Sequence, residues 1–311
     1  MPDTWHETIY ENKHTVVNEF IQKKQAMGRA DRTLNEYSRT LREFFHDTFP
    51  DTHPADITVG DIEEYVMHLD DRGCAQNTKR RYLESLSSFY SWAMKRPRFE
   101  DITGDPAGVV LEEIPKKVHD RPDCATWENG KQIINHIGDP RDKMVAILLA
   151  KTGCRVTEAL SIQMDDLMLD DGFIRLTNRK GGTQTVVPID NETIQALQRY
   201  NLVRGNPDTT SLFVSIRGEQ LGRERVRRVV RRAAVAAGVM EEGEKRFHRK
   251  FTPHTYRTVF TTEMRNAGMS DHVLRYIRGD SKNREAMDVY TKVNRETARD
   301  EYLDCIKPLD L

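Results

Sequence analysis

Apolar side chains recur at the spacing of an α-helix along most of this 311-residue chain. Such a stripe lets one face of a helix pack on a core, so several stripes in succession predict a helical unit. The first hundred residues carry three stripes: Val16, Val17, Phe20 and Ile21; Leu34, Tyr37, Leu41, Phe44 and Phe45; and Tyr82, Leu83, Leu86, Phe89, Tyr90, Ala93 and Met94. Between the last two, Thr58 can cap a further helix with Asp61. We predict a helical domain at 1–98.

A second domain is predicted to follow a linker. Segment 99–124 contains proline, glycine and acidic residues with little periodicity, which is typical of an extended linker. Residues 125–311 show helical patterns again, interrupted by two β-rich runs around Lys180-Gly181-Gly182, which indicates a hairpin. The predicted fold class is therefore mainly α, with a small antiparallel β-sheet in the second of two domains.

The composition argues against a membrane protein and a disulfide-stabilised one. No apolar run approaches the roughly 18 residues of a membrane span, and the first residues lack the order of a signal peptide. We therefore expect a cytoplasmic protein. Cys74, Cys124, Cys154 and Cys305 have neither CxxC nor Cys/His spacing, so neither a disulfide framework nor a structural zinc is expected. We predict no metal and no cofactor.

Charge is unevenly distributed, although the formal net charge is only −1. The segment Arg217–Lys250 holds eleven lysines and arginines against five acids, whereas Glu296–Leu311 holds two against five. Cations on one helix face suit a DNA backbone, and cations in a first helical turn suit an arriving phosphate, although a merely solvated face is the alternative there. The candidate DNA-binding residues are Lys79, Arg80 and Arg81 in the first domain and Arg225, Arg228 and Arg232 in the second.

Four stretches combine the residue types that phosphoryl transfer needs. Two arginines can bind the non-bridging oxygens of a phosphodiester and neutralise charge that develops there. A tyrosine can act as nucleophile, a histidine can accept its proton, and a lysine can protonate the leaving oxygen. The stretches are "TGCRVTEALSI" at 152–162, "NRKGGTQTVVPI" at 178–189, "TPHTYRTVFTTEMRNAG" at 252–268 and "IRGDSKNREAMDVYTKV" at 277–293. Together they support phosphoryl transfer without a metal.

In their order and spacing, these stretches resemble the tyrosine recombinase (phage integrase, Xer-like) family, and the resemblance runs from about Val16 to Lys292. It implies that 1–98 is a core-binding domain and 125–311 a catalytic domain, which together clamp double-stranded DNA. It also implies a homo-tetramer on DNA that exchanges strands through a Holliday junction. The C-terminal tail would dock on a neighbouring subunit, or else fold back on its own domain.

The resemblance also assigns roles to residues. It implies that Tyr290 attacks the scissile phosphate to give a 3′-phosphotyrosyl intermediate. Arg155 and Arg257 would bind the phosphate, and Glu158 would orient that pair. Lys180 would be the general acid, and His254 would accept the proton of the tyrosine.

Asp280 departs from the family pattern, which usually has His or Trp at this position to donate a hydrogen bond to the phosphate. An ionised carboxylate cannot donate and repels a phosphate. Three interpretations are open: Asp280 pairs with a phosphate-binding arginine and orients it, Lys282 or Asn283 replaces it, or the site is weak or inactive.

Several functions share these features. A type IB-like topoisomerase and a Xer-type resolvase of chromosome dimers use the same chemistry, and a recombinase-derived DNA-binding protein without catalysis is the alternative that Asp280 keeps open. The acid pairs Asp165-Asp166 and Asp170-Asp171 could suggest a metal nuclease, but we interpret them as solvated turn residues. The near-neutral charge and the Gly-Asp variant resemble archaeal integrases, so a virus- or plasmid-encoded gene is expected.

Overall fold

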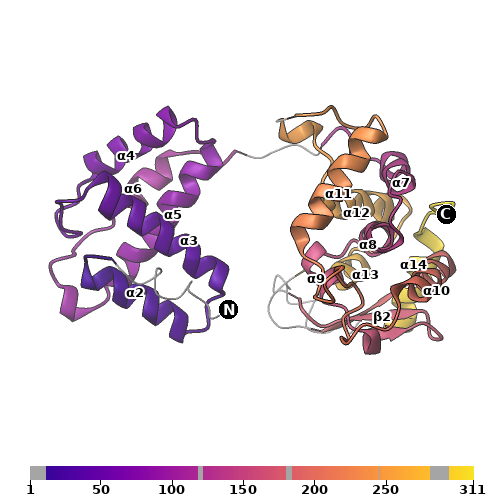
Figure 1. Cartoon of the computed structure of the whole chain (residues 1–311). Helices are drawn as coiled ribbons and strands as arrows, with labels where there is room; N and C mark the ends of the chain where they lie inside the picture. The colour runs from indigo at the N-terminus through magenta and orange to yellow at the C-terminus, as the bar shows by residue number, and fades with distance from the viewer. Residues whose placement is uncertain (1–11, 118–121, 180–183, 245, 281–293) are drawn as a thin grey trace. The chain divides into compact units, whose positions relative to one another are not determined.

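The computed structural model describes residues 12–117, 122–179, 184–244, 246–280 and 294–311. The chain divides into two compact units, Met1–Val118 and His119–Leu311, each with a hydrophobic core of its own (Figure 1). The described residues are mainly helical and include one small antiparallel sheet, which confirms the predicted fold class. Among them, no helix has both the length and the apolar character that a membrane crossing requires.

The first unit is a bundle of helices around an aromatic core. Phe20, Phe44, Phe45, Tyr65 and Phe89 are fully buried, and most of their ring contacts are edge-on, which aromatic pairs favour. The predicted capping box is confirmed: Thr58 and Asp61 bond to each other's backbone N–H. Its elements are α2 (Thr15–Ala26), α3 (Asp31–Arg42), a π-helical turn (Glu43–Thr48), α4 (Val59–Asp71), α5 (Gln76–Ala93), a 3₁₀ turn (Pro97–Phe99) and α6 (Pro106–Glu113).

Residues 106–113 of the predicted linker 99–124 instead form α6, which belongs to the first unit. Asp105 caps α6 and Pro106 occupies its first turn, both typical of a helix start. Ala107 and Val110 are buried in the first core, and α6 packs on α4 and α5. A helix of eight residues buries too few side chains to show a clear periodicity, so the sequence pattern missed it.

The second unit surrounds α8 (Pro140–Thr152), whose residues from Met144 to Thr152 are all buried. Neighbouring helices pack on α8, and the sheet lies at one end with strand order β1-β2-β3, all antiparallel (Figure 1). The strands on either side of the predicted hairpin are confirmed, whereas β1 was missed. The other elements are α7 (Trp127–Asn135), α9 (Val156–Leu160), a 3₁₀ turn (Met164–Asp166), β1 (Leu167–Met168), β2 (Phe173–Leu176), β3 (Thr185–Pro188), α10 (Asn191–Arg204), α11 (Arg223–Ala236), a 3₁₀ turn (Phe247–Arg249), α12 (Pro253–Asn266), α13 (Asp271–Arg278) and α14 (Arg295–Cys305).

The C-terminal tail packs on its own unit in this chain. Tyr302 of α14 and Leu309 are buried in the second core. The indole N–H of Trp127 donates to the carbonyl of Pro308 at 3.0 Å, and the backbone N–H of Leu309 donates to Glu192 at 2.8 Å. The tail therefore folds back, as one of the two predicted alternatives states. Docking on a neighbouring subunit stays a prediction.

Candidate active site

Arg155 is held at the start of α9 by Glu158. The preceding helix ends at Gly153 in the left-handed conformation with φ 59°, and a side chain there would overlap Phe260, so the turn requires glycine. The carboxylate of Glu158 accepts from the backbone N–H of Arg155 at 2.9 Å and from its Nη1 at 2.7 Å. Glu158 is buried, whereas the side chain of Arg155 is 33% exposed. The pair therefore presents one fixed guanidinium to solvent.

Arg257 lies in the first turns of α12 and is almost fully buried. Its Nη1 donates to the carbonyls of Gly153 at 2.7 Å and Arg278 at 3.0 Å, and its Nη2 donates to Asp280 Oδ1 at 2.5 Å. These acceptors come from two distant parts of the sequence, the turn before α9 and the end of α13. Arg257 thus joins the turn before α9 to the end of α13, and brings the first, third and fourth sequence motifs together.

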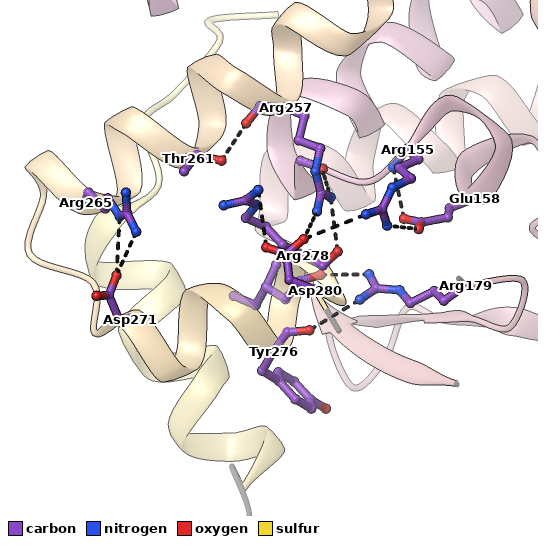
Figure 2. A network of polar contacts seen from close by, with 12 residues as sticks. Arg155, Glu158, Arg179, Arg257, Thr261, Arg265, Asp271, Tyr276, Arg278 and Asp280 are labelled. Carbon is purple, nitrogen blue, oxygen red and sulfur yellow. Dashed lines mark hydrogen bonds and ion pairs between the residues drawn. The ribbon is translucent and has the colours of Figure 1, made fainter. Parts of the chain in front are cut away.

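Asp280 lies at the centre of three guanidinium groups. Helix α13 ends at Gly279 in the left-handed conformation, which turns the next residue back toward the helix. Oδ1 of Asp280 lies 2.5 Å from Arg257 and 3.8 Å from Arg155, and Oδ2 lies 3.2 Å from Arg278 (Figure 2). Asp280 thus pairs with Arg257, as the first of the three interpretations expects; phosphate binding by this arginine stays a prediction. Lys282 and Asn283 lie outside the described residues.

Arg179 links the hairpin to α13 and was missed by the sequence analysis. It is 3% exposed, and its guanidinium donates to the carbonyls of Tyr276 at 3.3 Å and Ile277 at 2.7 Å, in the last turn of α13 (Figure 2). A side chain at Gly279 would overlap this guanidinium. Arg179, which follows β2, is therefore tied to the last turn of α13, shortly before Asp280. A possible signal was the Arg-Lys pair at 179–180, of which only the lysine was considered.

Burial and neighbouring charges shift the pKa values of two titratable groups near the site. Loss of water around His254, and then the positive charges of Arg257, Arg155 and Arg278, lower the pKa of its imidazole below the usual 6.5. The ring therefore stays neutral near pH 7 and can accept a proton. Burial raises the pKa of the Cys154 thiol to about 11, so this cysteine is not a nucleophile at neutral pH.

Comparison with known proteins identifies the family. Residues 126–297 match the model of the phage integrase family, and residues 16–98 match the phage integrase N-terminal SAM-like domain. The chain belongs to the phage integrase family. It is 28% identical to "Tyrosine recombinase XerD" of Bifidobacterium longum, covering 89% of this chain and 91% of the relative. It is 26% identical to "Tyrosine recombinase XerC" of Thermodesulfovibrio yellowstonii, covering 87% and 89%.

Solved structures share the fold of this integrase family member. A lambda integrase dimer bound to a COC′ core site matches with TM-score 0.70 and 19% identity, covering 91% of this chain and 99% of that one. The Tn1549 transposon integrase in complex with transposon right end DNA matches with TM-score 0.69 and 20% identity, covering 93% and 98%. A lambda integrase tetramer bound to a Holliday junction matches with TM-score 0.69 and 19% identity, covering 90% and 80%.

Two residues of the predicted site, Lys180 and Tyr290, lie outside the described residues. Arg179, which precedes Lys180, is bound to α13. Asp280, the last described residue before Tyr290, lies ten residues ahead of it. The structure thus brings Arg155, Arg257, Glu158 and Asp280 together. The roles of Lys180 and Tyr290 stay predictions.

The candidate DNA-binding cations of the first unit contact the unit itself. Lys79 pairs with Asp70, and Arg81 pairs with Glu36 at 2.5 Å. Arg80 donates to main-chain carbonyls at the end of α6, of which that of Leu111 lies at 2.9 Å. Arg80 thus stabilises the C-terminal end of that helix. DNA binding by Lys79, Arg80 and Arg81 stays a prediction.

The three candidate DNA-binding arginines of α11 fall into two groups. Arg225 lies 2.7 Å from the buried carboxylate of Asp142, so it has a structural contact besides its predicted role. Arg228 and Arg232 are exposed, and within the described parts of the chain neither makes an ion pair. Their face of α11 lies opposite Val226 and Val230, which are buried. Arg228 and Arg232 are thus available to a partner.

One of the four acids that were predicted to be solvated, Asp166, has a structural role instead. Asp166 is buried and accepts from the backbone N–H of Gln163 at 3.0 Å, which closes the 3₁₀ turn before β1. It also lies 3.7 Å from Arg175. No group of three or more His, Cys, Asp or Glu residues in the described ranges is arranged to hold a metal ion.

Proposed function

We propose that this chain is a site-specific DNA recombinase that cuts and rejoins strands through a covalent tyrosine intermediate. The observation that carries the proposal is the convergence of Arg155, Arg257 and Asp280 from three separate elements, at the start of the segment that leads to Tyr290. The match to both domains of the phage integrase family and the likeness to XerD over nearly the whole chain support it.

In the proposed reaction, the hydroxyl oxygen of Tyr290 bonds to the scissile phosphorus while the bond from phosphorus to the 5′ oxygen breaks. His254 accepts the tyrosine proton, and Lys180 donates a proton to the departing oxygen. Arg155 and Arg257 bind the non-bridging oxygens, where charge develops in the transition state. The 5′-hydroxyl of a second strand then reverses these steps and joins that strand. The phosphodiester energy is retained in the tyrosyl bond.

The partner is double-stranded DNA, bound at a specific site by a homo-tetramer. The solved lambda integrase tetramer on a Holliday junction, which has the same fold, supports this assembly. Docking of the tail on a neighbouring subunit would require residues 306–311 to leave the contacts with Trp127 and Glu192. The proposal places the protein on the nucleoid in the cytoplasm, and a virus- or plasmid-encoded gene fits it.

The test captures the covalent intermediate. Purified protein is incubated with sheared genomic DNA from its source organism, and complexes that survive detergent are recovered, digested with protease and sequenced. A nicked duplex of the recovered site is then used to measure the rate of adduct formation. We expect an adduct with wild-type protein and none with Tyr290→Phe. If wild-type protein forms no adduct, the chain is a DNA-binding protein without catalysis.

The rate of adduct formation should depend on pH through His254. The neutral imidazole accepts the proton, and neighbouring charges lower its pKa, so activity should persist on acidification and fall only below about pH 6.5. Arg155→Gln removes one of those positive charges and should move the midpoint upward. Single-turnover rates between pH 5 and 8 give the midpoint. A flat profile over this range would exclude His254 as the proton acceptor.

Arg228 and Arg225 should respond differently to removal of their charge. Arg228→Gln should weaken DNA binding and reduce the slope of log K against log salt by about one, as expected for one lost phosphate contact. Arg225→Gln should lower the free energy of unfolding, because it leaves the buried Asp142 without this partner. Binding titrations at several salt concentrations and urea unfolding measure the two effects. An unchanged salt slope in Arg228→Gln would exclude its phosphate contact.

A further inference from the structure

The two arginines of the predicted site are each already paired with a carboxylate. Arg155 lies 2.7 Å from Glu158, and Arg257 lies 2.5 Å from Asp280. Two positive and two negative charges leave these four side chains without net charge, whereas a phosphodiester brings a negative charge of its own. His254 does not add charge, because its lowered pKa favours the neutral ring. Besides Lys180, which acts at the leaving oxygen in the proposed reaction, a phosphate at this site therefore calls for a further cation at its non-bridging oxygens.

Arg278 supplies a further cation from the last turn of α13. Its Nη2 lies 3.2 Å from Asp280 Oδ2, while Arg257 binds the other carboxylate oxygen. Figure 2 shows Arg278 and Arg155 on opposite sides of this carboxylate. The two oxygens of the Asp280 carboxylate thus hold the guanidinium groups of Arg257 and Arg278 close together. Their separation suits two oxygens of one anion, such as a phosphate.

Arg278 is also accessible to a ligand. Its side chain is 23% exposed, compared with 33% for Arg155 and 4% for Arg257. A phosphate that arrives from solvent therefore reaches Arg155 and Arg278 more readily than the buried Arg257.

The donors of Arg278 are not all used. Its Nε is buried, and no group in the described parts of the chain accepts a hydrogen bond from it. A buried donor without an acceptor is unfavourable, and a phosphate oxygen would satisfy it. The planar guanidinium matches two oxygens of one phosphate.

We propose that Arg278 is a third phosphate-binding arginine of this site. The inference rests on the proposed recombinase function, because it assigns a residue to the same reaction. Arg278 makes and breaks no bond. It compensates the negative charge on the non-bridging oxygens, which Arg155 and Arg257, paired with Glu158 and Asp280, do not compensate alone.

A neutral substrate tests the proposal. Adduct formation is measured with two nicked duplexes, one with the natural phosphodiester at the scissile position and one with an uncharged methylphosphonate there. Arg278→Gln should slow the reaction of the phosphodiester about 100-fold. On the methylphosphonate, the rate of Arg278→Gln should be within about fivefold of the wild-type rate, because the uncharged substrate has less negative charge to compensate. Equal losses on both substrates would mean a structural role, and no loss on either would mean no contact; each outcome overturns the proposal.

Two more variants control for folding and for general charge. Arg278→Lys keeps the charge but lacks the planar guanidinium. On the phosphodiester it should react at least tenfold faster than Arg278→Gln. Arg275→Gln removes an exposed cation one turn earlier in α13 and should stay within about threefold of wild type on both duplexes. A loss in Arg275→Gln equal to that in Arg278→Gln would overturn the proposal. Absence of an adduct in wild type, by contrast, contradicts the recombinase function itself.

Discussion

Replacement of Arg257 by glutamine is expected to slow covalent adduct formation about 10³-fold. The side chain of Arg257 makes several hydrogen bonds and carries a positive charge, and glutamine cannot replace both. The arginine donates to Gly153, Arg278 and Asp280, which joins the turn before α9 to the end of α13. It also carries the positive charge that we propose binds a phosphate oxygen. Without it, the carboxylate of Asp280 loses a partner at 2.5 Å and repels the phosphate. Single-turnover rates on the nicked duplex measure the loss.

Arg265 of the same helix provides the matched control. Its side chain is 57% exposed and pairs with Asp271 at 3.2 Å, an exposed ion pair of the kind that contributes little. Arg265→Gln should therefore leave the rate within about threefold of wild type. Arg257→Gln should still bind the duplex, since it leaves the proposed DNA contacts of Arg228 and Arg232 unchanged. A rate loss in Arg257→Gln below tenfold would contradict its assignment to the phosphate.

The sequence predicted those parts of the fold that depend on local patterns. The cap at Thr58 requires only residues three apart, and the strands on both sides of Lys180 require only a short apolar run and a turn signal. The linker prediction failed at α6 because its helix is short and its buried side chains contact α4 and α5, which precede it in the sequence. That contact is tertiary, so no local pattern contains it.

The same distinction holds in the site. The order of the motifs correctly predicted that Arg155, Arg257 and Asp280 lie close together, since each is part of a recognisable stretch. Arg179 and Arg278 lie inside those stretches but were missed, and for Arg179 the reason is that its contacts lie far away in the sequence. Arg179 binds carbonyls 97 and 98 residues away. The Arg-x-Asp spacing at 278–280, with opposite charges flanking a glycine, was the one local signal for Arg278.

The role of Lys151 could not be predicted from the sequence pattern either, since this lysine lies among apolar residues of a buried helix. It is fully buried, and its Nζ contacts Asp190 at 2.6 Å, Glu192 at 2.5 Å and the carbonyl of Lys307 at 2.8 Å. Glu192 in turn accepts from the backbone N–H of Leu309. One buried ammonium thus connects α8, the start of α10 and the C-terminal tail.

Lys151→Met is therefore expected to lower the free energy of unfolding of the second unit by about 3–5 kcal/mol, because it leaves two carboxylates without their buried partner. Hydrogen exchange in the full chain measures this loss in peptides of α8 and α10, and should show earlier exchange at 307–311. Lys131→Met is the matched control: Lys131 pairs with Asp310 of the same tail on the surface, so its loss should barely change exchange in α8. Equal exchange in the two variants would mean that the buried lysine does not anchor the tail.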